Sequence, residues 1–348
     1  MSNISRKDSF GGDVLFVDGL PGCGKTLISR LLATLERVEL LSYSYEIEHY
    51  CALAHLGKID PDAAAALIKI QSDLKIYNAM MGRDVNCRPS DLSSIFNHHD
   101  PMFYLKRFFE SGDEVVPDRV SVERPILNLA VHNLLAFSKT LWEALGSRCI
   151  FIEVVRHPLY MVRQQVLNFE NLIGDKRDFT VYFSHNGIEL PYYVKGWEDE
   201  YLQLTPMEKV IRNIQNITSM TNIFKQEMRS SYHCKILTIP FESFVLDPLP
   251  WLEKISNLIG AQFTKATRKV LDEQNVPREK IADGVDLDIY RRCGWTPPVG
   301  DASERDELMI RRQDVVRNVS CEILSILDVL SHEYEKTYWN PDAATRKD

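Results

Sequence analysis

The sequence has few cysteines, and their arrangement excludes two common uses of this residue. The chain of 348 residues contains seven cysteines, an odd number, widely scattered and without a Cys-x-x-Cys pair. A disulfide framework normally shows an even number of cysteines, and a zinc site shows close cysteine or histidine spacing. We therefore expect neither of them, and we expect a cytoplasmic location, where thiols stay reduced.

Long apolar runs and an excess of basic residues are also missing. No segment approaches the roughly 18 consecutive apolar residues of a membrane span, and residues 1–13 are too polar for a secretory signal. The 41 Lys and Arg residues face 49 Asp and Glu residues, which gives a net charge of −8. This charge argues against a nucleic-acid partner, so that any anion site must be local.

The composition that is present is that of an ordinary folded protein. Hydrophobic residues make up 45% of the chain and charged residues 26%, with 16 glycines and 16 prolines. These values exclude a collagen-like, disordered or coiled-coil chain. We expect a single domain over residues 1–348, with insertions at about 60–117 and about 178–197.

Apolar segments of strand length alternate with segments of helical period. We expect strands at 14–17, 38–43, 127–132, 149–155 and 234–239. A helix is expected over 62–80, with an apolar face made of Leu67, Ile70, Leu74 and Tyr77. The alternation predicts an α/β fold of three layers, a central parallel five-stranded sheet with helices on both faces.

Two features lie outside this alternation. Asn186-Gly187 stands between β-rich flanks, which is the strongest short signal for a hairpin. Apolar residues recur at helical spacing over 304–338. We therefore expect an inserted β-hairpin and a long C-terminal helix.

The segment 19–26 reads Gly-Leu-Pro-Gly-Cys-Gly-Lys-Thr and matches the phosphate-loop pattern G-x-x-x-x-G-K-[ST]. It follows an expected strand and leads into an expected helix, which is the context that the pattern requires. Glycines let backbone N–H groups turn towards a phosphate, the helix N-terminus adds a partial positive charge, and the lysine adds a full one. The residues expected to hold phosphate are Pro21, Gly22, Cys23, Gly24, Lys25 and Thr26.

Two more polar residues come at the ends of expected strands. Arg156 follows the strand at 149–155, and a guanidinium there can bind a phosphate through two hydrogen bonds. His132 closes the strand at 127–132. Because ligands of open α/β sheets bind at the carboxyl ends of the strands, we expect Lys25, His132 and Arg156 to face one crevice.

Five segments in order resemble the sulfotransferases that use 3′-phosphoadenosine-5′-phosphosulfate. They are the phosphate loop, the strand ending at His132, the Arg156-His-Pro158 element, Phe241-Glu-Ser-Phe-Val-Leu-Asp-Pro248 with Leu258-Ile-Gly260, and Arg291-Arg-Cys-Gly-Trp295. The resemblance covers most of the chain. It implies a P-loop fold, this sulfate donor without a required metal, and a small-molecule or carbohydrate acceptor with a hydroxyl group.

The resemblance also implies roles for individual residues. Residues 22–26 would hold the 5′-phosphosulfate, with Lys25 stabilising charge on the leaving side. Arg156 would bind the 3′-phosphate, and Gln164 stands where the family has a serine. The loop over the donor nucleotide would contain Arg291, Arg292 and Gly294.

The identity of the acceptor base stays open between a histidine and two glutamates. The resemblance favours His132 as the general base, because histidine can accept a proton near neutral pH without tuning. Some branches of the family use a glutamate about twenty residues past the loop instead. Glu46 and Glu48 stand at that distance.

Two other functions stay open. In an ATP-dependent small-molecule kinase, Thr26 would bind Mg²⁺ and Glu153 would be the acidic residue at the end of a strand. Lys25 favours this alternative, because it occupies the lysine position of true nucleotide triphosphatases. A non-catalytic nucleotide-binding module is the third candidate, although the sequence has no Asn/Thr-Lys-x-Asp signature for guanine.

Aromatic residues gather in and after the expected hairpin. They are Tyr182, Phe183, Tyr192, Tyr193 and Trp197. Two interpretations stay open: a stacking wall for the acceptor, or ordinary packing between strands.

Overall fold

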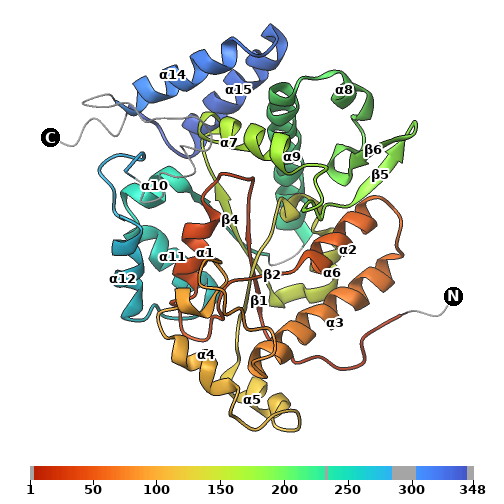
Figure 1. Cartoon of the computed structure of the whole chain (residues 1–348), viewed down its shortest axis with the longest axis vertical. Helices are drawn as coiled ribbons and strands as arrows, with labels where there is room; N and C mark the ends of the chain where they lie inside the picture. Colours follow the sequence, from red (N-terminus) through yellow and green to blue (C-terminus); the bar gives the residue numbers. More distant parts are fainter. Residues whose placement is uncertain (1–3, 232–233, 284–302, 343–348) are drawn as a thin grey trace.

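Five parallel strands form the central sheet (Figure 1), in a computed structural model that describes residues 4–231, 234–283 and 303–342. The strand order is β2-β3-β1-β4-β7, with β1 in the middle. The bounds are β1 Val14–Asp18, β2 Ser42–Tyr43, β3 Leu127–Ala130, β4 Cys149–Val155 and β7 Lys235–Pro240. The predicted parallel five-stranded sheet is confirmed.

Helices surround this sheet. The described helices are α1 (Lys25–Leu32), α2 (Tyr45–His55), α3 (Pro61–Met80), α4 (Pro101–Arg107), α5 (Val116–Glu123), α6 (Lys139–Leu145), α7 (Pro158–Asn171), α8 (Glu198–Gln203), α9 (Pro206–Ser231), α10 (Phe241–Leu246), α11 (Leu249–Ile259), α12 (Ala266–Glu273), α14 (Glu304–Val316) and α15 (Cys321–Thr337). Short 3-10 turns lie at Ile95–Asn97, Leu134–Phe137, Gly146–Arg148 and Tyr192–Val194. Among these elements, no helix has both the length and the apolarity to cross a bilayer.

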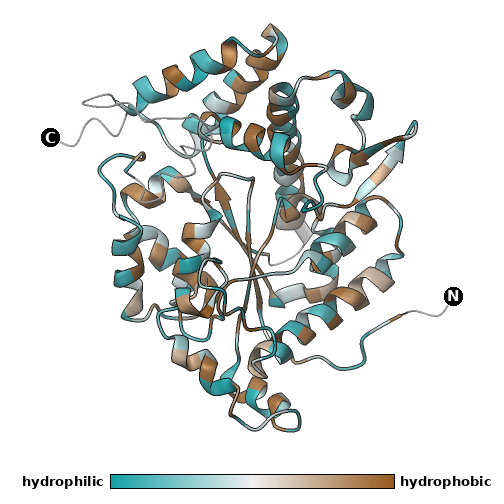
Figure 2. Cartoon of the chain, in the orientation of Figure 1, coloured by the Kyte–Doolittle hydropathy of each residue, from teal (hydrophilic) through white to brown (hydrophobic). Residues whose placement is uncertain are grey.

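The alternating side chains of β1 show the three layers. Leu15 and Val17 belong to one hydrophobic cluster, with α1, α7 and α15. Val14 and Phe16 belong to another, with α2, α3 and α6. Successive residues of a strand point to opposite faces, so the sheet separates two cores. Both are apolar, and in Figure 2 hydrophobic residues concentrate on the central strands.

The position of β1 brings three loops together. It pairs in parallel register with β3 on one side and β4 on the other. Because parallel strands end at the same edge, the loops that follow Asp18, Ala130 and Val155 are neighbours. This edge carries the phosphate loop, His132 and Arg156.

The predicted hairpin is also confirmed. Strands β5 (Tyr182–His185) and β6 (Ile188–Pro191) pair antiparallel, with His185 opposite Ile188. Asn186 and Gly187 form the two-residue turn with φ values of 50° and 81°. Positive φ at both positions matches the right-handed twist of a hairpin.

Two strands differ from their predicted bounds. The strand expected over 38–43 is reduced to β2, and Val38 makes only an isolated bridge with Ile126. The strand expected to end at His132 ends at Ala130, although Val131 still donates a backbone hydrogen bond to Val17. His132 therefore stands just beyond the sheet.

The apolar face of α3 was predicted only in part, since Tyr77 packs against the hydrophobic cluster but two of the other predicted residues do not face it. Ile70 and Leu74 are 41% and 45% exposed, whereas Ile68, Ile76 and Met80 are buried against the sheet. The helix carries apolar residues around most of its circumference, so its period fits more than one face. The face that is buried against the sheet begins at Ala64, which has a small side chain.

The single long C-terminal helix was also predicted wrongly, because two helices, α14 and α15, occupy this segment. The hydroxyl of Ser320 accepts a hydrogen bond from the backbone N–H of Ile323 and caps the second helix. The backbone N–H of Ser320 donates to Glu208 at 2.9 Å. The apolar spacing is similar on both sides of the break, so it could not reveal the cap.

Candidate active site

The phosphate loop follows β1 and needs glycine at two positions. At Gly19 (φ +143°) a Cβ would lie 2.2 Å from the carbonyl oxygen of Val154, and at Gly24 (φ +101°) it would lie 2.2 Å from Cδ2 of Phe241. Gly24 is the N-cap of α1. The loop therefore passes so close to β4 and to Phe241 that it excludes side chains at these positions.

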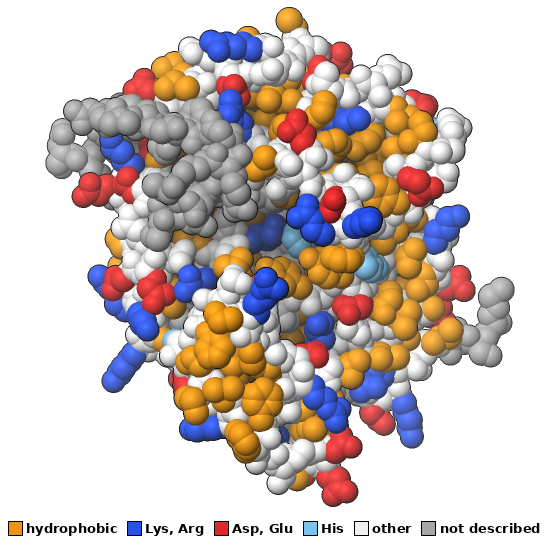
Figure 3. All heavy atoms as spheres, in the orientation of Figure 1, with side chains coloured by type: hydrophobic (Ala, Val, Ile, Leu, Met, Phe, Trp, Pro, Cys, Tyr) orange, Lys and Arg blue, Asp and Glu red, His pale blue; other side chains and the backbone are white. Residues whose placement is uncertain are grey.

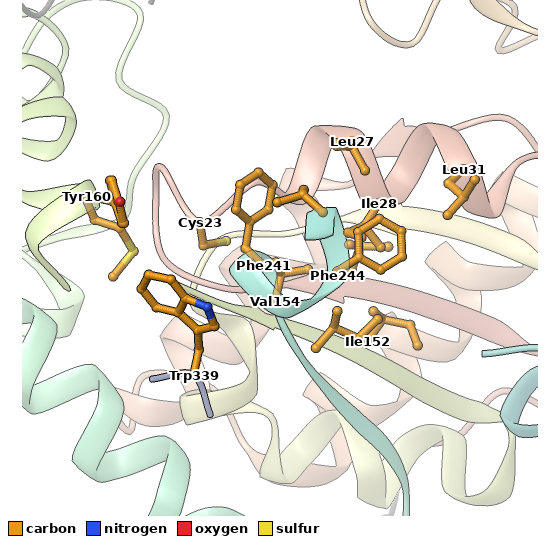
Figure 4. Packing of buried hydrophobic residues seen from close by; sticks show 14 of the residues in the cluster. Cys23, Leu27, Ile28, Leu31, Ile152, Val154, Tyr160, Phe241, Phe244 and Trp339 are labelled. Atoms are coloured by element: carbon orange, nitrogen blue, oxygen red, sulfur yellow. The ribbon is translucent and has the colours of Figure 1, made fainter. Parts of the chain in front are cut away.

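The side chain of Cys23 attaches the loop to the hydrophobic core. Its side chain is buried in the cluster with Phe241 and Val154, as Figure 4 shows. Burial raises the pKa of the Cys23 thiol, with the charge of Lys25 acting in the opposite direction. A buried thiol of this kind is structural rather than reactive.

Hydrogen bonds of Lys25 and Asp18 hold the two ends of the loop in place. The Lys25 ammonium donates to the carbonyl oxygens of Gly19 and Leu20. The buried Asp18 carboxylate accepts from the backbone N–H groups of Leu134 at 3.0 Å and Leu135 at 2.7 Å. Burial raises the pKa of Asp18, opposed by the charge of Lys25 and by backbone hydrogen bonds. Asp18 thus ties the start of the loop to the segment that follows His132.

Arg156 lies against the loop and is almost fully buried, at 8% exposure. Its Nη1 donates to the carbonyl oxygen of Gly22 at 2.9 Å. The guanidinium carbon lies 4.6 Å from the ring centroid of Phe241 and 5.0 Å from that of Tyr160. These rings hold the guanidinium at the mouth of the phosphate loop.

Lys25, His132 and Arg156 line one cavity of about 840 Å³, as expected from their strand ends. Figure 3 shows a hollow near the middle of this face, with histidine, lysine and arginine side chains around it. Six Lys or Arg residues but only two acidic residues, Glu48 and Asp178, are among the described lining residues. The lining is positive in a chain of net charge −8, so the anion site is local.

The remaining predicted loop residues also face this cavity. Pro21, Gly22, Gly24 and Thr26 line it together with Cys23 and Gln164. A Cβ on Gly22 would lie 2.9 Å from Oε1 of Gln164, so this glutamine lies directly against the loop. Arg291, Arg292 and Gly294 lie outside the described residues.

His132 and Glu48 come together across the cavity. Nδ1 of His132 lies 3.3 Å from a carboxylate oxygen of Glu48, which α2 supplies from its first turn. The imidazole is nearly parallel to the rings of Tyr43 and Tyr45, with centroids 6.5 Å and 6.3 Å away. An imidazole held by a carboxylate and aromatic rings is suited to accept a proton.

Glu46 occupies a different position from that predicted. It is exposed, its carboxylate accepts a hydrogen bond from Ser44 Oγ at 3.0 Å, and it is not among the described residues that line the cavity. Residues two apart on a helix do not share a face, so only one of Glu46 and Glu48 can point inwards.

Glu153, the acidic residue of the kinase alternative, is engaged elsewhere. Its carboxylate accepts from Lys225 at 2.8 Å and from Thr238 at 2.5 Å. It is buried and is not among the described residues that line the cavity at the phosphate loop. Within the sheet Glu153 is in register with Asp18, the residue that precedes the loop.

Some aromatic residues in and after the hairpin face the cavity, as a wall for the acceptor would, and others pack within the hairpin. Tyr192 and Tyr193 line the cavity. Phe183 and Trp197 instead pack around Leu190 and Tyr201, and Tyr182 donates its hydroxyl to Asp178. Part of the cluster therefore faces a ligand-sized space, and the rest stabilises the hairpin.

Arg30 and Arg278 are among the cavity-lining residues that were missed from the sequence. Arg30 lies on α1, and Arg278 lies 5.6 Å from the ring centroid of Phe241, on the wall that also carries Arg156. Neither belongs to a motif. The helical period places Arg30 on the polar side of α1, but no sequence signal connects Arg278 with the loop.

No family model and no curated protein matches the chain. Solved structures that are similar include a sulfotransferase domain from the olefin synthase of Synechococcus PCC 7002, with a TM-score of 0.39 and 15% identity over 90% of this chain and 98% of that chain. Sulfotransferase STF9 from Mycobacterium avium gives 0.39 and 12% over 89% and 77%, and a sulfotransferase from Alicyclobacillus acidocaldarius gives 0.36 and 14% over 91% and 95%.

Proposed function

We propose that this chain is a sulfotransferase, an enzyme that moves a sulfuryl group from 3′-phosphoadenosine-5′-phosphosulfate to an acceptor hydroxyl. One observation carries the proposal. A phosphate loop with Arg156 held against it shares a cavity with the imidazole–carboxylate pair of His132 and Glu48. The first two features suit a nucleotide with an extra phosphate, and the pair suits deprotonation of a hydroxyl.

The residues present fit such a donor. Gly22 and Gly24 line the cavity with positive φ and without side chains, so the loop backbone can come close to a bound phosphate. Arg156 and Arg278 lie on the wall beside Phe241 and add positive charge next to the loop. An anion with phosphates at two positions of the ribose would match these separate charges.

The chemistry divides between the two sides of the cavity. The donor supplies an activated sulfuryl group. Lys25 stabilises the negative charge that develops on the leaving phosphate, and Arg156 fixes the nucleotide for in-line transfer. His132 takes the proton of the acceptor hydroxyl as the new sulfur–oxygen bond forms, and Glu48 orients the imidazole and stabilises its protonated form.

We propose that the reaction requires no metal and that the acceptor is a small molecule or a carbohydrate. We also propose that the protein is cytoplasmic. The kinase alternative is weakened because Glu153 is bound to Lys225 and Thr238 rather than free at the loop. The aromatic residues Tyr192 and Tyr193 on the cavity wall favour an acceptor with an apolar or ring-shaped body.

The test is calorimetric titration with adenosine 3′,5′-bisphosphate without metal, compared with ATP plus Mg²⁺. We expect the bisphosphate to bind, and to bind more tightly than adenosine 5′-monophosphate, because the 3′-phosphate gains contacts with Arg156. The variant Arg156→Lys keeps the charge but loses the fork of hydrogen bonds, so it should reduce this preference for the bisphosphate about tenfold or more. Tight binding of Mg²⁺-ATP with no bisphosphate binding would favour the kinase.

A further inference from the structure

The cavity continues well past the phosphate loop. Gln164 and Gln165 of α7 contact the loop, through Gly22 and through the carbonyl oxygen of Pro21 at 3.1 Å. Leu172, just after the same helix, still lines the cavity. Because a helix rises about 1.5 Å per residue, the cavity extends roughly 12 Å from Gln164 to Leu172.

This far part of the cavity is mainly apolar and aromatic. Phe169 and Leu172 come from the end of α7, and Tyr192, Tyr193 and Tyr201 come from the segments after the hairpin. The Tyr201 ring lies 6.2 Å from that of Phe169. These side chains form a wall suited to an apolar or aromatic molecule.

Lys209, in the first turn of α9, adds a cation to this wall. Its Nζ lies 4.5 Å from the ring centroid of Tyr201 and 5.8 Å from that of Phe169. Within the described ranges, no carboxylate lies within ion-pair distance of it. Burial lowers the pKa of Lys209. The ammonium is thus partly removed from water and is offset only by aromatic rings.

The other charged groups near this wall are already engaged. Asp178 accepts from the hydroxyl of Tyr182 at 2.5 Å and from the backbone N–H groups of Thr180 and Gly174. Arg177 is paired with Asp175 at 2.7 Å. Asp178 keeps its negative charge in these hydrogen bonds, but among the described residues it forms no ion pair with Lys209, so the Lys209 ammonium still has no anionic partner in this part of the cavity.

We propose that Lys209 binds an anionic group, a carboxylate or a phosphate ester, on the acceptor molecule. The body of this acceptor packs against the wall of Phe169, Tyr193 and Tyr201, while its hydroxyl reaches His132. The inference rests on the proposed function and names the class of its substrate, an acidic hydroxyl compound with an apolar or aromatic body.

The acceptor is a better partner for Lys209 than the donor nucleotide. The donor's anions have their own cations at the loop, Lys25 and Arg156, with Arg278 beside them. Lys209 lies instead beside Phe169, and Phe169 is one helical turn beyond Gln165 on α7. An anion bound there lies several ångströms from the loop.

The test uses full-length protein saturated with adenosine 3′,5′-bisphosphate. The probes are 4-hydroxyphenylacetate, 3-(4-hydroxyphenyl)propanoate and 4-(4-hydroxyphenyl)butanoate, each compared with its neutral amide, and 4-hydroxybenzylphosphonate as the phosphate-like anion. We expect at least one anion to bind about tenfold more tightly than its neutral counterpart at low salt. Comparing the affinities of the carboxylates with that of the phosphonate shows which of the two kinds of anion Lys209 prefers.

The variant Lys209→Met keeps an apolar side chain of similar length and should remove this preference, with Lys209→Gln as a second variant. Lys195→Met is the matched control, since Lys195 is exposed, contacts the carbonyl oxygen of His55 and is not among the described lining residues. It should keep the preference. Three outcomes would overturn the inference. They are equal binding of anion and amide, failure of every anion to bind, and an unchanged preference for the anion in both Lys209 variants.

Bisphosphate affinity separates this inference from the proposed function. We expect it to be unchanged in Lys209→Met. A marked loss would place Lys209 against the donor and overturn the acceptor role. If the wild-type protein does not bind the bisphosphate at all, the proposed function itself fails, and the inference fails with it.

Discussion

Nδ1 of His132 lies 3.3 Å from a carboxylate oxygen of Glu48, although 84 residues separate them in the chain. The histidine follows β3 and the glutamate lies on α2, so the sheet edge brings the two together. Two of the three candidates for the acceptor base, His132 and Glu48, are therefore in contact with each other. Both residues line the cavity that contains the phosphate loop.

The first prediction concerns this pair. His132→Ala should lower kcat by about 10²-fold to 10⁴-fold, because the acceptor hydroxyl loses its base. Glu48→Gln should lower kcat by a smaller factor, about tenfold, with little change in the KM for the donor. The measurement is steady-state sulfate transfer to an acceptor found by screening hydroxyl compounds.

Glu46→Gln is the matched control, because it makes the same chemical change two residues from Glu48 on an exposed side chain. It should leave turnover near that of the wild-type protein. A loss of turnover in Glu46→Gln, with Glu48→Gln unaffected, would show that the geometry has been assigned to the wrong glutamate.

The second prediction concerns Lys25. Lys25→Ala should lower turnover by about 10²-fold or more, because the leaving phosphate loses its stabilising charge. The melting temperature should change little, since the Lys25 ammonium donates to the loop carbonyls of Gly19 and Leu20 and its side chain is not part of the buried core. Activity and thermal unfolding of the same preparation measure both effects, and a fully active variant would contradict the assigned role.

The sequence predicted the parts of the site whose chemistry requires a local pattern. The phosphate loop was found because glycines and a lysine at fixed spacing are needed for close contact with phosphate. Arg156 and His132 were found because they stand at strand ends. Lys209 and Arg278 were missed because they reach the cavity only through tertiary packing.

The same distinction applies to the fold. The buried strand β4 was predicted with its observed bounds, since a continuous apolar run has one interpretation when helices flank it. The face of α3 was not, because Ile70 and Ile68 are equally apolar and only the sheet decides between them. The break between α14 and α15 depends on the cap at Ser320 and on its bond with Glu208.

The third prediction tests the close approach at Gly24. Gly24→Ala should destabilise the protein by about 2–4 kcal/mol, because the new Cβ would overlap the buried Phe241 ring and the residue would keep a positive φ. Gly57→Ala is the control, since Gly57 also has a positive φ (+66°) but nothing within 4 Å of a new Cβ. It should destabilise by about 1 kcal/mol.

Urea unfolding measures both variants. The difference between them isolates the steric contact with Phe241 from the backbone strain that the two positions share. Equal destabilisation in both variants would mean that the phosphate loop moves away from Phe241 at little energetic cost, and the close approach would not be what requires glycine at position 24.

The last prediction concerns pH and the contact between the two C-terminal helices. Glu335 on α15 lies 3.4 Å from Nε2 of the buried His157 and 2.9 Å from Nη1 of Arg305 on α14. The hydrogen bond with His157, together with those from Arg305, lowers the pKa of Glu335 to about 2. A carboxylate whose pKa is lower in the folded state stabilises that state above its unfolded pKa, and this contribution is lost as the pH falls towards the folded value.

Glu335→Gln should therefore reduce stability at pH 7 by about 1–2 kcal/mol, a value that allows for partial screening by solvent. The difference from the wild-type protein should persist down to about pH 4.5 and then shrink as the pH falls towards 2. Glu333→Gln, a change on the exposed side of the same helix, should have little effect at either pH. Urea unfolding at pH 7, 5 and 3 measures these free energies of unfolding. If the difference between Glu335→Gln and wild type stays constant across the three pH values, the charge of Glu335 does not hold α15 to α14.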